Sequence, residues 1–260
     1  MRKIFFLTIF TILFTVKSSL INAGYTNSIT ILAPESMTSS LIEIIRNYSR
    51  KSSQNVSLIF DNNKRYIELI EDGNPADIII TNHPSWINSL KLKGLIDVNS
   101  ISNLVEDRFA LVMNKEFYDL YKEQLISRTN QPSRWNRFIT NNFKLAILNP
   151  KLDPTSNSAL STLKNANIHF QAENIIYSND LNLELNESSD ILVMSPLSLL
   201  HDRQDLNIIK IFSSETDERF IYQAALIASE NMKESNKILQ YIKTDKNKEI
   251  FKKHGFRIIK

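Results

Sequence analysis

The sequence contains no cysteine and is poor in glycine and histidine, with four residues of each among 260. The lack of cysteine excludes disulfides, thiol nucleophiles, cysteine-ligated metals and a lipid-modified N-terminal cysteine. The four scattered glycines cannot form a glycine-rich phosphate loop, and no two histidines have the spacing of metal ligands. The G-x-S-x-G and H-E-x-x-H motifs of hydrolases are absent as well. These absences favour a binding protein over an enzyme, and we expect neither a cofactor nor a metal site.

The first 23 residues have the pattern of a secretory signal peptide. A basic start at residues 1–3 precedes an apolar stretch of 13 residues, Ile4–Val16. Lys17 ends this stretch well short of the ~20 apolar residues that cross a bilayer. We therefore expect export to the periplasm and cleavage near Ala23.

The net charge of the mature chain bears on whether the protein binds nucleic acid. Arg2, Lys3 and Lys17 are the only charged residues of the signal segment, so its removal reduces the 31 basic residues to 28. The chain also has 28 acidic residues, and its mature form is formally neutral. A neutral chain gives no electrostatic support for nucleic-acid binding.

Apolar strands and amphipathic helices alternate along the mature chain, which predicts an α/β fold with mainly parallel sheets. Strands are expected, for example, at 56–60, 76–80, 144–148 and 190–194. Helices are expected after most of these strands, and two more helices close the chain. No internal repeat or long linker interrupts the pattern.

The stretch Ser28–Thr38 is the clearest strand-to-helix turn. Ile29–Leu32 reads as a buried strand, and Ser36 and the hydroxyls of residues 38–40 are candidates for capping the helix that follows. A helix start at the end of a strand presents backbone N–H groups that attract anions. The turns at Asn62-Asn63 and at residues 154–156 are similarly rich in neutral hydrogen-bonding groups. These turns suit a small oxyanion, although each of them is also explained by an ordinary helix cap.

Several segments, in this order, resemble the molybdate-binding proteins of ABC importers, which are type II periplasmic substrate-binding proteins. The resemblance extends over about residues 27–259, and the G-x-P-A-D-like segment together with the G-F ending is its most specific part. The matching segments are I-T-I-L-A-P-E-S-M (Ile29–Met37), D-G-N-P-A-D-I-I-I-T (Asp72–Thr81), W-I-N-S-L-K-L-K-G-L-I (Trp86–Ile96), L-A-I-L-N-P-K-L-D-P-T-S (Leu145–Ser156), I-L-V-M-S (Ile191–Ser195) and I-F-K-K-H-G-F (Ile250–Phe256).

The resemblance implies two α/β lobes, each a mainly parallel sheet flanked by helices, joined by two crossover strands. Residues 1–23 would be the signal peptide, 27–107 plus 221–260 would form lobe 1, and 108–220 would form lobe 2. A monomeric protein would capture a small oxyanion between the lobes and deliver it to an ABC transporter permease in the membrane. Molybdenum would enter only as the bound oxyanion, not as a coordinated metal.

The ligand-binding positions of the family are carried over residue by residue. The first-turn serine corresponds to Ser36, and the serine of the second turn is replaced by Asn63. The backbone donor after the proline of the family's V-P-A-G motif falls on Thr155. The donor at the next helix start falls near Leu181, and the tyrosine of the G-[IV]-V-Y strand is replaced by Met194, which cannot donate a hydrogen bond.

These departures leave three functional readings. The first is an oxyanion-binding protein of an ABC importer, with a different anion or an organic acid as a variant of it. The second is a periplasmic interaction protein whose cleft is filled, for instance by Lys64 or Met194. The third, a secreted enzyme, requires a histidine or a carboxylate pair in the cleft.

Overall fold

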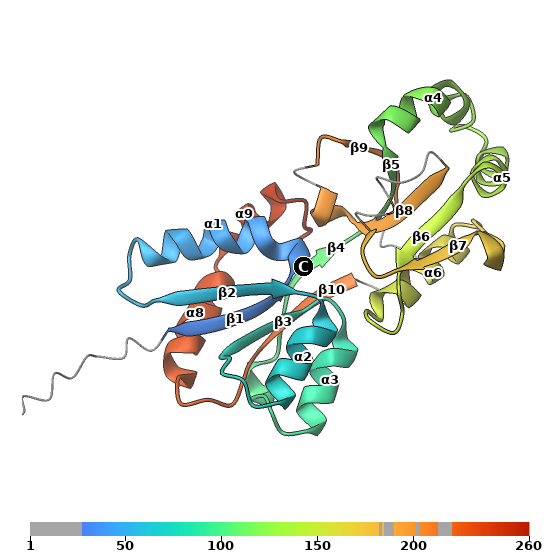
Figure 1. Cartoon of the computed structure of the whole chain (residues 1–260). Coiled ribbons are helices and arrows are strands. Elements are labelled where there is room, and N and C mark those ends of the chain that lie inside the picture. The colour runs from blue at the N-terminus through green and yellow to red at the C-terminus, as the bar shows by residue number, and fades with distance from the viewer. Residues whose placement is uncertain (1–27, 182–183, 185–189, 201–202, 213–219, 260) are drawn as a thin grey trace, which may run out of the picture.

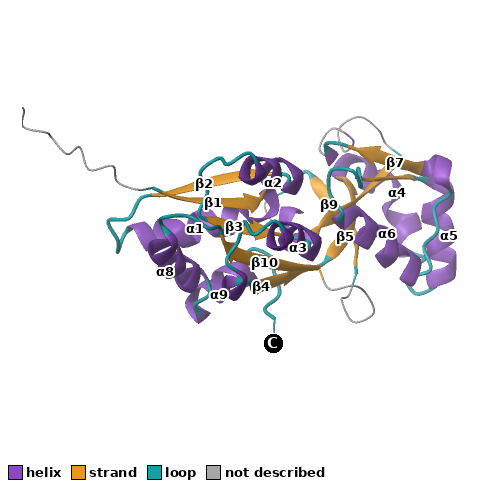
Figure 2. Cartoon of the chain, turned by 90° about the horizontal axis from the view of Figure 1, so that it is seen from below, coloured by secondary structure: helices purple, strands orange, loops and turns teal. Residues whose placement is uncertain are grey.

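The computed structural model describes residues 28–181, 184, 190–200, 203–212 and 220–259. The predicted signal peptide lies outside the described residues. Two five-stranded sheets, each flanked by helices, form two lobes that lie side by side (Figures 1 and 2). None of the described helices combines the length and apolar character that crossing a bilayer requires.

Lobe 1 contains the sheet with strand order β2-β1-β3-β10-β4. Its strands are β1 (Ile29–Pro34), β2 (Val56–Asp61), β3 (Ile78–Thr81), β4 (Ser102–Asp107) and β10 (Phe220–Leu226). Its helices are α1 (Thr38–Ser49), α2 (Asn63–Glu71), α3 (Pro84–Leu92), α8 (Met232–Ile242) and α9 (Asp245–Lys253), with short 3-10 turns η1 (Glu35–Met37) and η2 (Val98–Ser100).

Lobe 2 contains the sheet with strand order β7-β6-β8-β5-β9. Its strands are β5 (Phe109–Asn114), β6 (Lys144–Leu148), β7 (Ile175–Ser178), β8 (Ile191–Pro196) and β9 (Leu206–Ile211). Its helices are α4 (Lys115–Ile126), α5 (Pro132–Asn142) and α6 (Thr155–Asn165), with 3-10 turns η3 (Ala172–Asn174) and η4 (Leu197–Leu200).

The central strands β1 and β3 of lobe 1 are largely apolar on both faces because helices cover both sides of the sheet. Successive side chains of a strand point to opposite faces. Ile31 of β1 packs in the cluster that holds the buried faces of α1, α8 and α9, whereas its neighbour Leu32 packs with α2 and α3. The continuous apolar run of β1 is thus explained by its burial between two helical layers.

The α/β prediction is confirmed, but the sheets are mixed rather than mainly parallel. In lobe 1, β1 pairs in parallel with β2 and β3, and β10 pairs antiparallel with β3 and β4. In lobe 2, β6 pairs in parallel with β7 and β8, and β5 pairs antiparallel with β8 and β9. The two sheets therefore have equivalent topologies.

Two local features differ from the expectations. Strand β4 was not predicted, because its sequence is largely polar and only three of its side chains, Leu104, Val105 and Asp107, are buried. The hydroxyls of Thr38 and Ser40 donate to the carbonyls of Glu35 and Met37 instead of accepting from backbone N–H groups. Helix α1 accordingly begins at Thr38, and its N-cap residue, Met37, provides no side-chain cap.

Candidate functional site

A cavity of about 410 Å³ lies between the lobes at the carboxyl ends of the parallel strands. In lobe 1 it is lined at the ends of β1, β2 and β3 by Pro34, Asp61 and Asn82. In lobe 2 it is lined at the ends of β6 and β8 by Leu148 and Ser195, and just after β7. This is the edge at which open α/β sheets bind ligands, because the following helices begin there.

Ser36 lines the cavity from the short turn η1 that follows β1. Its Oγ shares a hydrogen bond of 2.7 Å with the hydroxyl of Tyr222, a fully buried residue of the antiparallel strand β10. Desolvation and the nearby carboxylate of Asp107 raise the pKa of Tyr222 well above its usual range. Tyr222 therefore remains a neutral phenol that orients the Ser36 hydroxyl.

Asn63, the first residue of α2, lines the cavity and is 1% exposed. Its Nδ2 donates to Asn82 Oδ1 at 2.5 Å and to Asp153 Oδ2 at 3.2 Å. Its Oδ1 accepts a hydrogen bond from the hydroxyl of Tyr66 on the same helix. Both the donor and acceptor groups of this amide are thus engaged within the protein.

Thr155 begins α6 on the opposite side of the cavity. Its backbone N–H donates to Asp153 Oδ1 at 2.9 Å. The structure therefore brings Ser36, Asn63 and Thr155 to a common cavity, although they are far apart in the sequence.

Leu181 also lines the cavity and contributes an apolar wall. Met194 is misplaced by the carry-over: its side chain is 2% exposed and packs in the hydrophobic core with Leu192. Its neighbours on β8, Val193 and Ser195, are the ones that line the cavity. The alternation of side chains along a strand explains why a shift of one residue exchanges core for cavity.

Sequence reasoning missed two residues that organise the site, Asn82 and Asp153. Both are nearly buried and both line the cavity. Asn82 directly follows β3, so its place at a strand end was an available signal. Asp153 directly precedes Pro154 in the polar turn before α6, so an acidic side chain at this turn was also visible in the sequence.

The described cavity lining is acidic. Glu35 and Asp61 belong to lobe 1, and Asp153 and Asp180 belong to lobe 2. Desolvation raises the pKa of Glu35, with further contributions from Asp61 and Asp180. Carboxylates of both lobes thus line one cavity.

Arg203 is the only cationic side chain among the described residues of the lining. Its Nε and Nη2 donate to the two carboxylate oxygens of Asp205 at 2.8 and 2.6 Å. Its charge is thus already balanced by a neighbouring carboxylate. No group of three or more histidine and acidic side chains within the described ranges is arranged to hold a metal ion.

A second polar cluster lies where the chain passes from lobe 1 to lobe 2. Asp107, at the end of β4, is 1% exposed and accepts a hydrogen bond of 2.6 Å from the hydroxyl of Ser198 in lobe 2. Burial raises the pKa of Asp107 to about 6, and the hydrogen bond from Ser198 opposes part of this shift. Phe109 and Phe220 stack beside it with ring centroids 4.9 Å apart. This cluster links the two lobes through the hydrogen bond from Ser198 to Asp107.

Comparison with known proteins assigns the family. The family model described as bacterial extracellular solute-binding protein matches residues 29–257. The molybdate-binding protein ModA of Escherichia coli is 23% identical over 239 residues, covering 88% of this chain and 89% of that protein. The molybdate-binding protein ModA of Haemophilus influenzae is 20% identical over 237 residues, with the same shares covered.

The fold is likewise shared with a solved structure. The periplasmic molybdate-binding protein of Azotobacter vinelandii superposes with a TM-score of 0.69 at 13% sequence identity, covering 89% of this chain and 100% of that one. The two-lobed architecture expected from the resemblance is thereby confirmed. Proteins of this type bind solutes without transforming them, in agreement with the prediction that the chain is not an enzyme. From the match over residues 29–257, the chain belongs to the family of bacterial extracellular solute-binding proteins.

Proposed function

We propose that this chain is a periplasmic solute-binding protein that captures a small, molybdate-like oxyanion between its lobes and delivers it to an ABC transporter permease. The observation that carries the proposal is the convergence of neutral donors from both lobes, Ser36, Asn63 and Thr155, on one cavity. The molybdate-binding names of the curated relatives support the same class of solute. Leu181 would contribute shape to the site rather than a hydrogen bond.

The chemistry of these donors suits an anion. The amide of Asn63 and the backbone N–H of Thr155 lie at the starts of α2 and α6, where the helix dipole favours negative charge. A hydrogen bond to a charged ligand contributes ~1.5–3 kcal/mol. Several such bonds reach the roughly −8 kcal/mol of micromolar binding after the costs of ordering are subtracted.

Transport requires that binding be reported to a permease. A ligand that contacts both lobes favours their closed arrangement, and hinge closure is the signal that such importers read. We propose that the mature chain, after removal of residues 1–23, acts as a monomer with lobe 1 formed by about 27–107 and 221–260. The formed cavity argues against the reading of a filled cleft, since neither Lys64 nor Met194 belongs to its described lining.

A second class of solute is favoured by the charge of the cavity. Four carboxylates face one guanidinium that is already paired with Asp205. A dianion such as molybdate would be repelled by this lining, whereas an organic acid that also carries an amine would place its cation against the carboxylates. The alternative solute is therefore a zwitterion of similar size.

A thermal-shift panel separates these candidates. Mature protein is heated with millimolar molybdate, tungstate, sulfate, phosphate, simple carboxylates or amino acids. A solute present at 100 times its Kd should stabilise the protein by about 2.7 kcal/mol. Stabilisation by the inorganic anions supports the oxyanion, and stabilisation by amino acids alone supports the zwitterion.

The variant Ser36→Ala tests the site itself. It should weaken binding of whichever solute stabilises the wild type, because a hydroxyl at the cavity is lost. Ser49→Ala, an exposed serine at the far end of α1, is the matched control and should bind as the wild type does. Equal affinities for the two variants, or no stabilisation by any compound of the panel, would contradict the proposal.

A further inference from the structure

Asp153 accepts hydrogen bonds from the same groups that the proposed function assigns to the ligand. The side-chain amide of Asn63 donates to Oδ2, and the backbone N–H of Thr155 donates to Oδ1. Asn82 adds a longer contact of 3.5 Å from its Nδ2 to Oδ2. One carboxylate is thus bound by two residues of lobe 1 and one of lobe 2.

The hydrogen-bonding groups of Asn63 are all occupied within the protein, so a solute must displace one of their partners in order to bind there. An amide nitrogen carries two hydrogens. One is directed to Asn82 and the other to Asp153, while the oxygen accepts from Tyr66. An external anion can therefore bind the side-chain nitrogen of Asn63 only if it replaces the carboxylate of Asp153 or the side-chain oxygen of Asn82. The same holds for the backbone N–H of Thr155, which has one hydrogen and donates it to Asp153.

The hydrogen bonds that connect Asp153 of lobe 2 to Asn63 and Asn82 of lobe 1 are buried, which strengthens this connection between the lobes. Asn63, Asn82 and Asp153 are each at most 5% exposed. Hydrogen bonds to a charged group are stronger where water is excluded than at the surface. The contact from Asn63 to Asp153 crosses the boundary between the lobes, as a bound solute would.

We propose that the carboxylate of Asp153 is a built-in substitute for the anionic ligand, which bridges the two lobes and competes with solute for the donors of the site. Asp153 thereby sets both the resting arrangement of the lobes and the threshold concentration for binding. The inference rests on the proposed function for the identity of the competing solute, but its conformational part does not.

The experiment measures the distance between the lobes in the absence of added solute. The chain has no cysteine, so Lys91→Cys on α3 and Ser161→Cys on α6, both exposed, provide unique sites for a pair of spin labels. The pair is introduced into the mature wild type and into Asp153→Asn, which keeps the shape of the side chain and removes its charge. Asp61→Asn is the matched control, since it removes a cavity carboxylate whose hydrogen bonds come from Asn62 within lobe 1.

We expect Asp153→Asn to lengthen the mean distance by more than about 2 Å or to broaden its distribution, while Asp61→Asn leaves both unchanged. Unchanged distances in both variants would overturn the bridge, and so would equal changes in both. Asp153→Ala serves as a second test with the same expected direction, and circular dichroism verifies that each variant is folded.

Calorimetric titration with molybdate separates this inference from the proposed function. We expect Asp153→Asn to bind molybdate at least about tenfold more tightly than the wild type. An opening of the lobes without molybdate binding in any variant would support the bridge and refute the oxyanion. Molybdate binding that is equal in the wild type and Asp153→Asn would overturn the competition by Asp153 and leave the oxyanion proposal standing.

Discussion

Lobes 1 and 2 share a sheet topology but present different chemistry to the cavity between them. In each lobe, three parallel strands are followed by an antiparallel strand, and a fifth strand that is antiparallel to this one forms the edge of the sheet. Lobe 1 contributes the two amides that donate to the carboxylate, Asn63 and Asn82, whereas lobe 2 contributes the carboxylate itself, Asp153. Two lobes with the same sheet topology thus present hydrogen-bond donors from lobe 1 and an acceptor from lobe 2.

The comparison separates what determines the fold from what determines the site. The apolar residues of β1 alternate between two helical layers, and those of β6 alternate between the cluster that includes α4, α5 and α6 and a smaller apolar cluster on the other face of the sheet. Other apolar residues of similar size would meet the same requirement. The residues after the strands contribute little to the core and are free to vary in charge. A family fold can therefore persist while the ligand chemistry of one lobe changes.

The largest expected effect concerns equivalent core positions of the two lobes. Ile31 in β1 and Leu145 in β6 are fully buried, and replacing either by alanine should destabilise the protein by about 2–5 kcal/mol. One hydrophobic cluster contains residues of both lobes, so each variant should unfold in a single transition at lower temperature. Two separate unfolding transitions in calorimetry would contradict the prediction that the two lobes share a common core and unfold together.

The next effect concerns Asp107, where the lobes join. Its pKa is about 6 in the folded protein and 3.8 in its reference state. Between these values the folded protein holds a proton that the unfolded chain has released, so stability falls as the pH rises through this window. The shift corresponds to about 3 kcal/mol lost between pH 4 and pH 7.

Asp107→Asn should remove this part of the pH dependence, because the amide does not titrate. Urea denaturation at pH 4, 5, 6 and 7 measures the free energy of unfolding of both proteins. We expect the wild type to lose stability relative to Asp107→Asn as the pH rises. A constant difference across the range would show that Asp107 does not carry a raised pKa.

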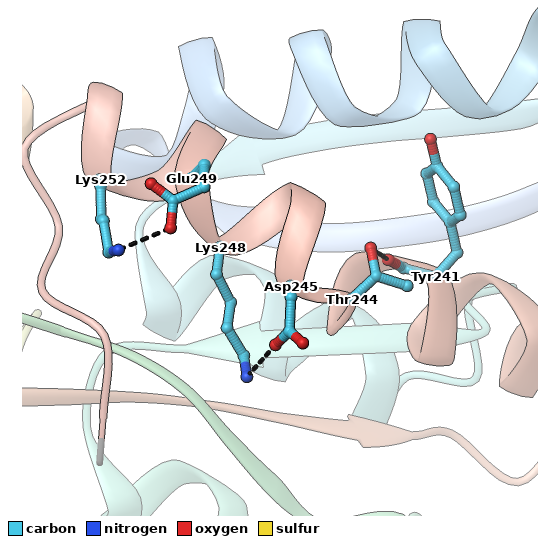
Figure 3. A network of polar contacts seen from close by, with 6 residues as sticks. All are labelled: Tyr241, Thr244, Asp245, Lys248, Glu249 and Lys252. Carbon is cyan, nitrogen blue, oxygen red and sulfur yellow. Dashed lines mark hydrogen bonds and ion pairs between the residues drawn. The ribbon is translucent and has the colours of Figure 1, made fainter.

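The smallest effect concerns the exposed ion pairs of α9. Lys248 contacts Asp245 and Lys252 contacts Glu249, each one turn apart on the surface (Figure 3). Such pairs are screened by water and salt, and they lie away from the cavity. Lys248→Ala should therefore show no measurable change in Tm or in solute binding, and a clear loss of either would mean that α9 has a role beyond packing.

The sequence was informative where local rules apply. The apolar runs predicted most strands, and the polar turns after β1, β2 and β6 contain Ser36, Asn63 and Thr155, all of which line the cavity. Strand β4 was missed because its pairing with β10, rather than its own composition, makes it a strand. Apolar patterns and turn residues can be recognised within a short stretch of sequence, whereas the pairing of two distant strands cannot.

The errors at the site have the same origin. Asp153 was missed because its partner Asn63 is 90 residues away, and no spacing rule connects them. Met194 was assigned to the site because β8 lacks the tyrosine of the family's G-[IV]-V-Y strand. Without that tyrosine, the sequence does not show which of the neighbouring residues of β8 faces the cavity. A register shift of one residue on a strand reverses the face, so Val193 and Ser195 reach the cavity instead.

Hydrogen–deuterium exchange with and without solute tests most directly whether one ligand is shared by both lobes. The mature wild type is measured with the solute that stabilises it most in the thermal-shift panel, beginning with molybdate. We expect slower exchange in peptides of both helix starts, residues 35–41 and 155–161, and unchanged exchange in α9. Slower exchange in one lobe alone, or in neither, would contradict a solute held between them.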